Sequence, residues 1–358
     1  MLDAAQLALF DVGAEQLVLL PYDTAGTTEG AARAARAAIA DGAKLILGPV
    51  YSGSVAAVAP IALAAGINVV AFSSDRAVAR PGVFVMGLLP EEQVARVVAV
   101  AVGAGHQRFA ALVPASSYGQ AVVKALRAAV AEARATLTDV VFYPADAAGA
   151  ADVADIVRVF TDYDARRAAL VAQRRRLKAC ADEVSREALR RLEGRDTLGE
   201  VNFDAVLLPE GGPRLITVAA LLPFYDVDVR KVRLLGTALW ETAPVTEEPA
   251  LVGGWYAAPP KARTAAFAAR FAKAFGRGPP ALATLAYDAI ALAGALAKQP
   301  EGANFSARML SAPGGFRGLD GIFRFTAEGL NERGLSIYEV TADGVVEKIP
   351  APESFAGF

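Results

Sequence analysis

The feature that most constrains the fold is a regular alternation of alanine-rich helical stretches with short apolar runs rich in β-branched residues. Over the first part of the chain this alternation predicts helices at 2–10, 28–40 and 54–65 and strands at 16–21, 44–47 and 67–72. Continuous apolar strands such as Leu45-Ile46-Leu47 are typical of parallel sheets covered by helices on both faces. The sequence therefore predicts an α/β fold.

A second series of the same kind begins after Gly103-Ala104-Gly105. It predicts strands at 109–113, 139–143, 203–208 and 232–235, with helices at 119–133 and 213–222. Towards the end of the chain we predict strands at 253–257, 321–325 and 335–340 and helices at 262–275 and 282–297. The chain thus contains two α/β lobes, in agreement with the domain number expected for 358 residues.

Composition excludes several functional classes. Lys and Arg total 36 and Asp and Glu total 38, so a net charge of −2 gives no broad electrostatic reason to bind nucleic acid. The charged segment 164–192 mixes bases with acids and indicates a solvated helical insert in the second lobe. Mean hydropathy is +0.35, but the uncharged stretch 55–72 is interrupted by Pro60, Gly66 and Asn68. We therefore predict no transmembrane segment in this chain.

Catalytic and metal chemistry have little support. His106 is the only histidine and Cys180 the only cysteine, which excludes a His-rich metal site and an intramolecular disulfide. The sequence contains no Gly-x-Ser-x-Gly elbow, no P-loop, and no Gly-x-Gly-x-x-Gly after a strand. We predict a protein that is not an enzyme and that has no cofactor and no metal.

Two groups of residues resemble known proteins. The run 41–49 (Asp-Gly-Ala-Lys-Leu-Ile-Leu-Gly-Pro), followed by Ser52-Gly53-Ser54, resembles the front of type I periplasmic binding proteins of the leucine/isoleucine/valine-binding group. The runs 207–212, 234–237, 253–256 and 321–325 look like the penicillin-binding-protein activator lipoproteins that share this fold. The resemblance covers nearly the whole chain.

This resemblance implies two Rossmann-like lobes with parallel sheets, joined by three hinge crossovers, with a ligand held between the lobes. We expect the crossovers near 103–107, 251–256 and 325–329. The N-terminal lobe would then comprise 1–105 and 256–328, and the C-terminal lobe 106–255 and 329–358. The mechanism implied is hinge closure, in which ligand or partner shifts the balance between open and closed states.

One departure from the family concerns the start of the chain. Family members begin with a strand, central in the first sheet, before the helix that here starts at Leu2. Without it, two rows of backbone donors and acceptors would lack partners. We therefore expect the first strand to be missing, through truncation or replacement by another segment.

Candidate ligand-binding residues lie in loops that follow predicted strands, because ligands of open α/β sheets bind beyond the carboxyl ends of the strands. In the first lobe, Ser52 and Ser54 precede a helix whose free N–H groups could hold a carboxylate, although either serine could instead cap that helix. Ser73 and Ser74 match positions where the family carries hydroxyl contacts to an amino acid. The neighbouring Asp75 departs from that pattern.

In the second lobe, Tyr118 could close over a ligand, or pack where the lobes join. Glu210 could receive a ligand ammonium, or serve as an acid at a helix N-terminus. Trp240 is a candidate wall of the cleft, whereas Trp255 fits a core position.

Two functions stay open. The closest resemblance implies a periplasmic regulator of peptidoglycan synthesis that contacts a penicillin-binding protein. The alternative is a periplasmic receptor that delivers an amino-acid-like solute to the permease of an ABC transporter. Either function implies export, so we expect that a signal or lipid anchor lies outside this chain.

Overall fold

The computed structural model describes residues 1–13, 15–146, 149–180, 182–300 and 302–355. Contacts divide the chain into two units: one comprises Met1–Glu92, Pro259–Ser336 and Pro350–Phe358, and the other comprises Gln93–Ala258 and Ile337–Ile349. The first crossing thus falls at 92/93 rather than at 103–107, and the later ones at 258/259 and 336/337. A fourth crossing follows Ile349.

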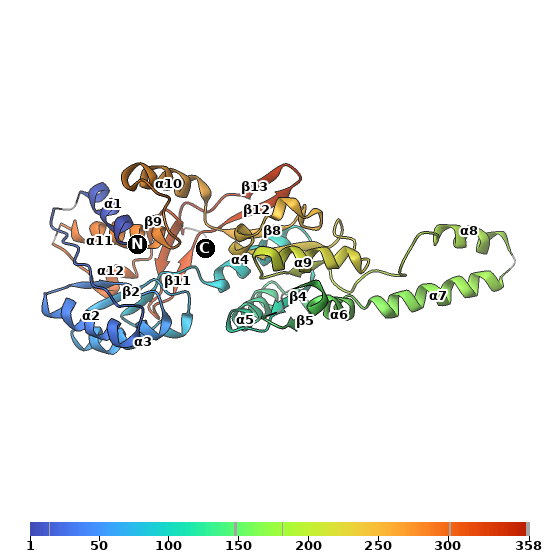
Figure 1. The fold of residues 1–358 in the computed structure, drawn as a ribbon, viewed down its shortest axis with the longest axis horizontal. Helices are drawn as coiled ribbons and strands as arrows, with labels where there is room; N and C mark the ends of the chain where they lie inside the picture. The colour runs from blue at the N-terminus through green and yellow to red at the C-terminus, as the bar shows by residue number, and fades with distance from the viewer. Residues whose placement is uncertain (14, 147–148, 181, 301, 356–358) are drawn as a thin grey trace. The chain divides into compact units, whose positions relative to one another are not determined.

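The first unit contains a parallel sheet in the order β1-β2-β3 and a separate antiparallel sheet in the order β11-β10-β9 (Figure 1). Its strands are β1 (Leu45–Leu47), β2 (Asn68–Ala71), β3 (Val83–Val85), β9 (Phe316–Gly318), β10 (Gly321–Phe325) and β11 (Asn331–Arg333). Its helices are α1 (Leu2–Val12), α2 (Thr28–Ala40), α3 (Ser52–Ala64), α10 (Lys261–Phe275), α11 (Ala283–Ala297) and α12 (Ala307–Leu310), with the 3-10 helix η1 (Arg76–Val78).

The second unit is built on a seven-stranded sheet in the order β13-β12-β8-β7-β6-β4-β5. The strands are β4 (Arg108–Pro114), β5 (Thr136–Tyr143), β6 (Ala205–Leu207), β7 (Arg233–Thr237), β8 (Trp255–Ala258), β12 (Ser336–Thr341) and β13 (Gly344–Ile349). The helices are α4 (Pro90–Gly103), α5 (Ser117–Glu132), α6 (Ala150–Phe160), α7 (Tyr163–Ala179), α8 (Glu183–Arg191) and α9 (Gly212–Phe224), with the 3-10 helices η2 (Ala238–Thr242), η3 (Val245–Glu247) and η4 (Pro249–Leu251).

The strands β4 to β8 of the second unit are parallel, and apolar side chains on one face of this sheet, such as Leu112 and Leu208, form a core cluster with apolar side chains of α6 and α9. In the first unit, α11 is buried along most of its length, since its apolar residues surround the helix instead of forming one stripe. These observations confirm the predicted α/β fold with parallel sheets.

Two predicted elements differ. The predicted strand 16–21 is not formed: Leu17–Leu20 belong to no helix or strand and pair with no strand of the described chain. The charged segment 164–192 is two helices, α7 and α8, rather than one. The sequence prediction also omitted α4 and the strands β3, β9, β11 and β13. Three of these strands, β3, β9 and β11, have only three residues, too few for an alternation to be visible.

The parallel sheet of the first unit has an open edge at β1. β1 pairs with β2 on one side, and no described strand pairs with its other edge. In the same unit, α1 lies on α11.

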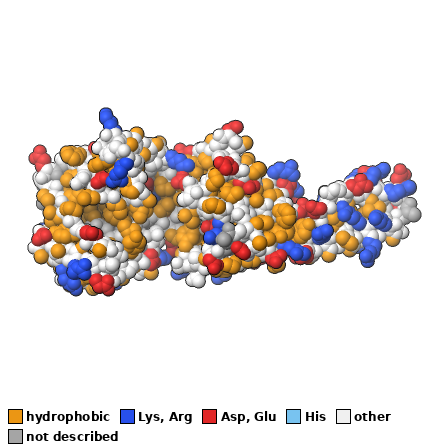
Figure 2. Space-filling model, viewed as in Figure 1, with side chains coloured by type: hydrophobic (Ala, Val, Ile, Leu, Met, Phe, Trp, Pro, Cys, Tyr) orange, Lys and Arg blue, Asp and Glu red, His pale blue; other side chains and the backbone are white. Residues whose placement is uncertain are grey.

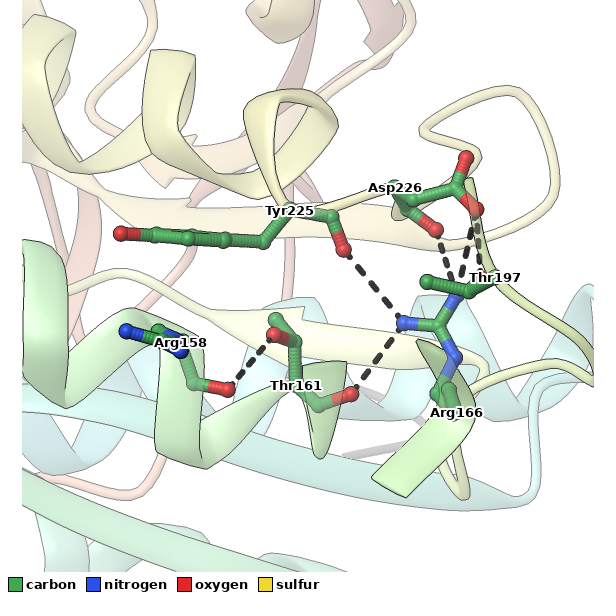
Figure 3. Close-up of polar contacts among 6 residues, drawn as sticks. All are labelled: Arg158, Thr161, Arg166, Thr197, Tyr225 and Asp226. Carbon is green, nitrogen blue, oxygen red and sulfur yellow. Dashed lines mark hydrogen bonds and ion pairs between the residues drawn. The ribbon is translucent and has the colours of Figure 1, made fainter. Parts of the chain in front are cut away.

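Arg166 ties the beginning of α7 to the body of the second unit. Its guanidinium donates to the carbonyls of Thr161 and Asp226 at 3.2 and 2.7 Å and to the Thr197 hydroxyl at 2.8 Å (Figure 3). A longer bond of 3.4 Å reaches the Tyr225 carbonyl. Beyond this anchor, α7 and α8 pack against each other, and their surface is dense with basic and acidic side chains (Figure 2).

Candidate functional site

The start of α3 presents backbone donors without acceptors. Tyr51 occupies the N-cap position but makes no side-chain cap, and the first bond of the helix runs from the Val55 N–H to the Tyr51 carbonyl. The N–H groups of Ser52, Gly53 and Ser54 have no acceptor among the described residues. Such a turn, at the positive end of the helix dipole, suits an anion.

The two serines of this turn differ in their environment. Ser54 is buried and donates its hydroxyl to the Thr27 carbonyl at 3.4 Å, whereas Ser52 is partly exposed and its hydroxyl has no partner in the described chain. Neither serine acts as the N-cap, so the capping alternative does not apply. Ser52 is thus the hydroxyl available beside the free N–H groups.

The loop after β2 uses most of its polar groups internally. The buried Ser73 hydroxyl accepts from the Asp75 N–H at 3.1 Å, and Asp75 in turn accepts from the Ala77 N–H at 2.9 Å and so caps η1. The Ser73 carbonyl accepts from the Gly87 N–H, where a Cβ would lie 2.3 Å from that oxygen. Of the two serines in this loop, only Ser74 is exposed, so only its hydroxyl faces solvent.

In the second unit, two tyrosines make hydrogen bonds at the carboxyl edge of the sheet. The Tyr118 hydroxyl lies 3.0 Å from that of Thr237, which ends β7, and burial raises the pKa of Tyr118 to about 12. The Tyr143 hydroxyl, at the end of β5, donates to Glu210 at 2.7 Å. Burial is the main reason that the pKa of Tyr143 is raised, and the bond to Glu210 adds to it. Both phenols are therefore neutral hydrogen-bonding groups.

Glu210 is already compensated within its own unit. Besides Tyr143, its carboxylate accepts from the Gly211 N–H at 3.1 Å and lies 3.5 Å from the Arg214 guanidinium. Arg214 also donates to the Ala145 carbonyl at 2.6 Å, which fixes its position. A ligand ammonium is therefore not required to balance the charge of Glu210.

Trp240 is not a wall of a site but part of the core. Its side chain has no exposed surface, its indole N–H donates to the Leu208 carbonyl at 2.9 Å, and its ring packs over Gly236 and Gly254. The chain turns into the 3-10 helix η2 directly after β7, which directs the indole inward. Trp255 is buried too, under the guanidinium of Arg233 at 4.4 Å.

The structure adds no sign of catalytic or metal chemistry in the part of the chain that it describes. His106 lies edge-on to Trp255 and 3.8 Å from Asp204, and burial lowers its pKa. Among the described residues, no group of three or more His, Cys, Asp or Glu side chains could hold a metal ion. None of the described helices combines the length and apolar character needed to cross a membrane.

Comparison with known proteins places the chain in a family. A family model described as "Periplasmic binding protein" matches residues 1–345. The chain belongs to the periplasmic binding protein family. The match spans nearly all of the described structure, so it includes the candidate loops of both units.

Solved structures similar to this periplasmic binding protein share its fold. A putative branched-chain amino acid ABC transporter protein from Rhodospirillum rubrum is 16% identical, with a TM-score of 0.73 over 97% of this chain and 93% of that one. The substrate-binding protein LivJ from Streptococcus pneumoniae, solved with isoleucine, is 16% identical, with a TM-score of 0.58 over 98% and 94%. A solute-binding protein from R. palustris, solved with benzoate, is 16% identical, with a TM-score of 0.58 over 99% and 92%.

Among curated proteins, an uncharacterized protein of Rickettsia prowazekii is 30% identical over 100 residues. Those residues are 28% of this periplasmic binding protein and 27% of that relative, so the chain matches about a quarter of the relative's length. These comparisons confirm the periplasmic binding protein family and fold implied by the sequence resemblance, and none of the proteins named above is a penicillin-binding-protein activator.

Proposed function

We propose that this periplasmic binding protein is a solute receptor of an ABC transporter and binds a small carboxylate outside the cytoplasm. The observation that carries the proposal is the uncapped first turn of α3, where three neighbouring N–H groups and the Ser52 hydroxyl lack acceptors. Isoleucine and benzoate, the ligands bound in two of the similar structures, both carry a carboxylate. The transporter permease is then the expected partner.

Neither acid of the candidate loops needs a ligand ammonium group as its partner. Glu210, the acid suggested for an ammonium group, already lies beside Arg214 and accepts from Tyr143. Asp75, the other acid in a candidate loop, caps η1. The start of α3 therefore requires a negatively charged group on the ligand, and an ammonium group on the same ligand is optional.

Regulation of cell-wall synthesis, the first function implied by the sequence resemblance, has weaker support. The similar structures described above are proteins of transport systems. A penicillin-binding protein therefore stays an untested partner, and we place solute uptake first.

A proline substitution tests the role of the α3 turn without removing the helix. Ser52 is the first residue of α3, a position that proline favours, and Tyr51 before it has φ −79° and ψ 135°, the extended backbone that a following proline requires. Ser52→Pro removes one N–H and the hydroxyl, whereas Ser52→Ala removes the hydroxyl alone. The two variants separate the backbone donor from the side chain.

Binding is measured by calorimetry with isoleucine and benzoate, each compared with its amide, isoleucinamide or benzamide. We expect the acids to bind and the amides to fail, because the turn attracts a negative charge. Loss of a hydrogen bond to a charged group weakens binding roughly 10- to 100-fold, so Ser52→Pro should raise Kd by that factor and Ser52→Ala by less. Equal binding of acids and amides, or an unchanged Kd in Ser52→Pro, would contradict the proposal.

A further inference from the structure

The helix α7 of the second unit differs in charge from the rest of the chain. The whole chain has a net charge of −2, but residues 165–179 contain no Asp or Glu and six bases, which are Arg166, Arg167, Arg174, Arg175, Arg176 and Lys178. The acids of the α7–α8 segment lie outside this run, at Asp164 in the first turn of α7 and within 182–193. Figure 2 shows basic side chains along most of the segment. The segment is mixed in sign as a whole, but α7 beyond its first turn carries positive charge alone.

Two of the six bases hold α7 in place. Arg166 makes the buried hydrogen bonds to the Thr197 hydroxyl and to backbone carbonyls of its own unit (Figure 3). Arg174 donates to the carbonyls of Leu192 and Arg195 at 2.7 and 3.0 Å, which ties the second half of α7 to the chain that follows α8. The helix is therefore anchored near its start and in its second half, so its exposed side chains keep a fixed spacing.

Three of the other bases share one exposed face of α7. Arg167, Val171, Arg175 and Lys178 recur at intervals of four, four and three residues, which is the spacing of one helix face. We call these four residues the α7 face. Its three bases are exposed and make no ion pair or hydrogen bond with the described residues. Val171, between them, is 51% exposed although it is apolar.

The charges around the α7 face are neutralised within the protein, in contrast to its own. On α8, Arg190 and Arg191 lie 2.7 and 3.3 Å from Glu187. At the start of α7, Asp164 lies 2.7 Å from Arg158 of α6. Like charges three or four residues apart destabilise a helix. The α7 face therefore gains stability only from an anionic partner, and no described residue supplies one.

We propose that the α7 face binds the surface of a bilayer that contains anionic phospholipid. Cations grouped around an exposed apolar side chain are the pattern of a peripheral lipid-binding helix, in which the cations reach headgroup phosphates and the apolar group enters the interface. The bases extend over about 17 Å of helix, which suits a plane of phosphates better than one small anion. An acidic protein would balance the charge but would give no role to the exposed valine.

This inference rests on the proposed function in one respect, which is that a receptor for an ABC transporter works beside a membrane-embedded permease. The α7 face would hold the receptor at that membrane. Its attraction is electrostatic and is therefore weakened by salt. The test needs no solute, so its result is independent of whether the start of α3 binds a carboxylate.

Vesicle flotation of the full chain measures the binding. The vesicles are phosphatidylcholine alone or an equimolar mixture of phosphatidylcholine and phosphatidylglycerol. The test variant combines three substitutions on the α7 face, Arg167→Gln, Arg175→Gln and Lys178→Gln. The matched control removes three exposed bases of the first unit and so changes the net charge equally, through Arg33→Gln, Arg36→Gln and Lys44→Gln.

Cys180 offers a second measurement at the end of α7. It is the only cysteine, it is exposed, and it directly follows the last residue of the helix. An environment-sensitive fluorophore attached to its thiol should shift its emission to the blue when anionic vesicles are added, because the bilayer interface is less polar than water. Vesicles of phosphatidylcholine alone should leave the emission unchanged.

We expect the wild type and the control variant to float with anionic vesicles at low salt and to be released at high salt. Each base near an anionic surface contributes roughly fivefold to affinity, so the α7 variant should bind on the order of 100-fold more weakly. Equal binding by the two variants would overturn the proposal, as would vesicle binding without a change in the Cys180 label. Failure of the wild type to bind anionic vesicles would also overturn it and would favour an acidic protein as the partner.

Discussion

Arg166→Met should loosen the α7–α8 segment and destabilise the second unit. Arg166 is 7% exposed and joins α7 to the Tyr225–Asp226 corner after α9 and to Thr197 (Figure 3). Methionine keeps an unbranched apolar chain in place of the arginine stem but supplies no donors. The change therefore isolates the hydrogen bonds from the packing.

The magnitude follows from the acceptors that the substitution leaves. The bonds to the Asp226 carbonyl and the Thr197 hydroxyl are short, at 2.7 and 2.8 Å, and those to Thr161 and Tyr225 are longer. Each buried acceptor left unsatisfied costs about 1–3 kcal/mol. Arg166 also borders a cavity of about 350 Å³ from which water can reach some of these groups, so we expect a loss of about 2–4 kcal/mol in all.

Thermal unfolding measures this loss. For a domain of about 150–250 residues, each kcal/mol lowers Tm by roughly 2–4 °C, so the transition of the second unit should fall by roughly 5–15 °C. Arg175→Met is the matched control, because Arg175 lies on the same helix but is exposed. Equal Tm values for the two variants would refute the view that the Arg166 hydrogen bonds anchor α7.

Three further predictions concern other buried groups. In Gly236→Ala, the added Cβ would lie 2.1 Å from the Trp240 ring, so urea unfolding should show a loss of about 1–3 kcal/mol, and an unchanged midpoint would contradict the packing. Burial raises the pKa of Glu92 from 4.5 to about 7, so the folded state retains a proton that the unfolded state releases, and stability falls as pH rises from 4.5 to 7. Glu92→Gln should remove this loss of stability, which is worth up to about 3 kcal/mol. Parallel plots of stability against pH for the two proteins would contradict the raised pKa of Glu92. In Asn331→Ala, the carbonyls of Val85 and Gly87 lose donors at 2.7 and 2.8 Å, so chemical denaturation should show that the free energy of unfolding falls by about 2–4 kcal/mol. An unchanged free energy of unfolding would contradict this.

The elements that the sequence predicts well are those whose determinants are local. α2 spans 28–40 as predicted, since Thr27 accepts from the Gly30 N–H and alanines recur on its buried face. The predicted strand at 16–21 fails for a different reason. Its residues have a strand pattern, but a strand forms only when neighbours satisfy its backbone, and those neighbours are set by the whole fold.

The candidate site shows the same division. The position of Ser52 at the start of a helix follows from the local pattern, and so does the placement of Tyr118 after a strand. The hydrogen-bond partners in the second unit cannot be predicted from the local pattern. Tyr118 and Thr237 lie 119 positions apart in the chain, and Tyr143 and Glu210 lie 67 positions apart. The burial of Trp240 depends in turn on two glycines, one of them beyond η4.

The candidate loops of the two units, each taken by itself, differ in the hydrogen bonds that an anion would gain. At the start of α3, three N–H groups and one hydroxyl have no acceptor, so an anion gains hydrogen bonds there without displacing any that exist. At the carboxyl edge of the second sheet, Tyr118 is bonded to Thr237 and Glu210 to Tyr143, so a ligand must compete with bonds already made. Substitutions at Ser52 should therefore change the affinity for every carboxylate.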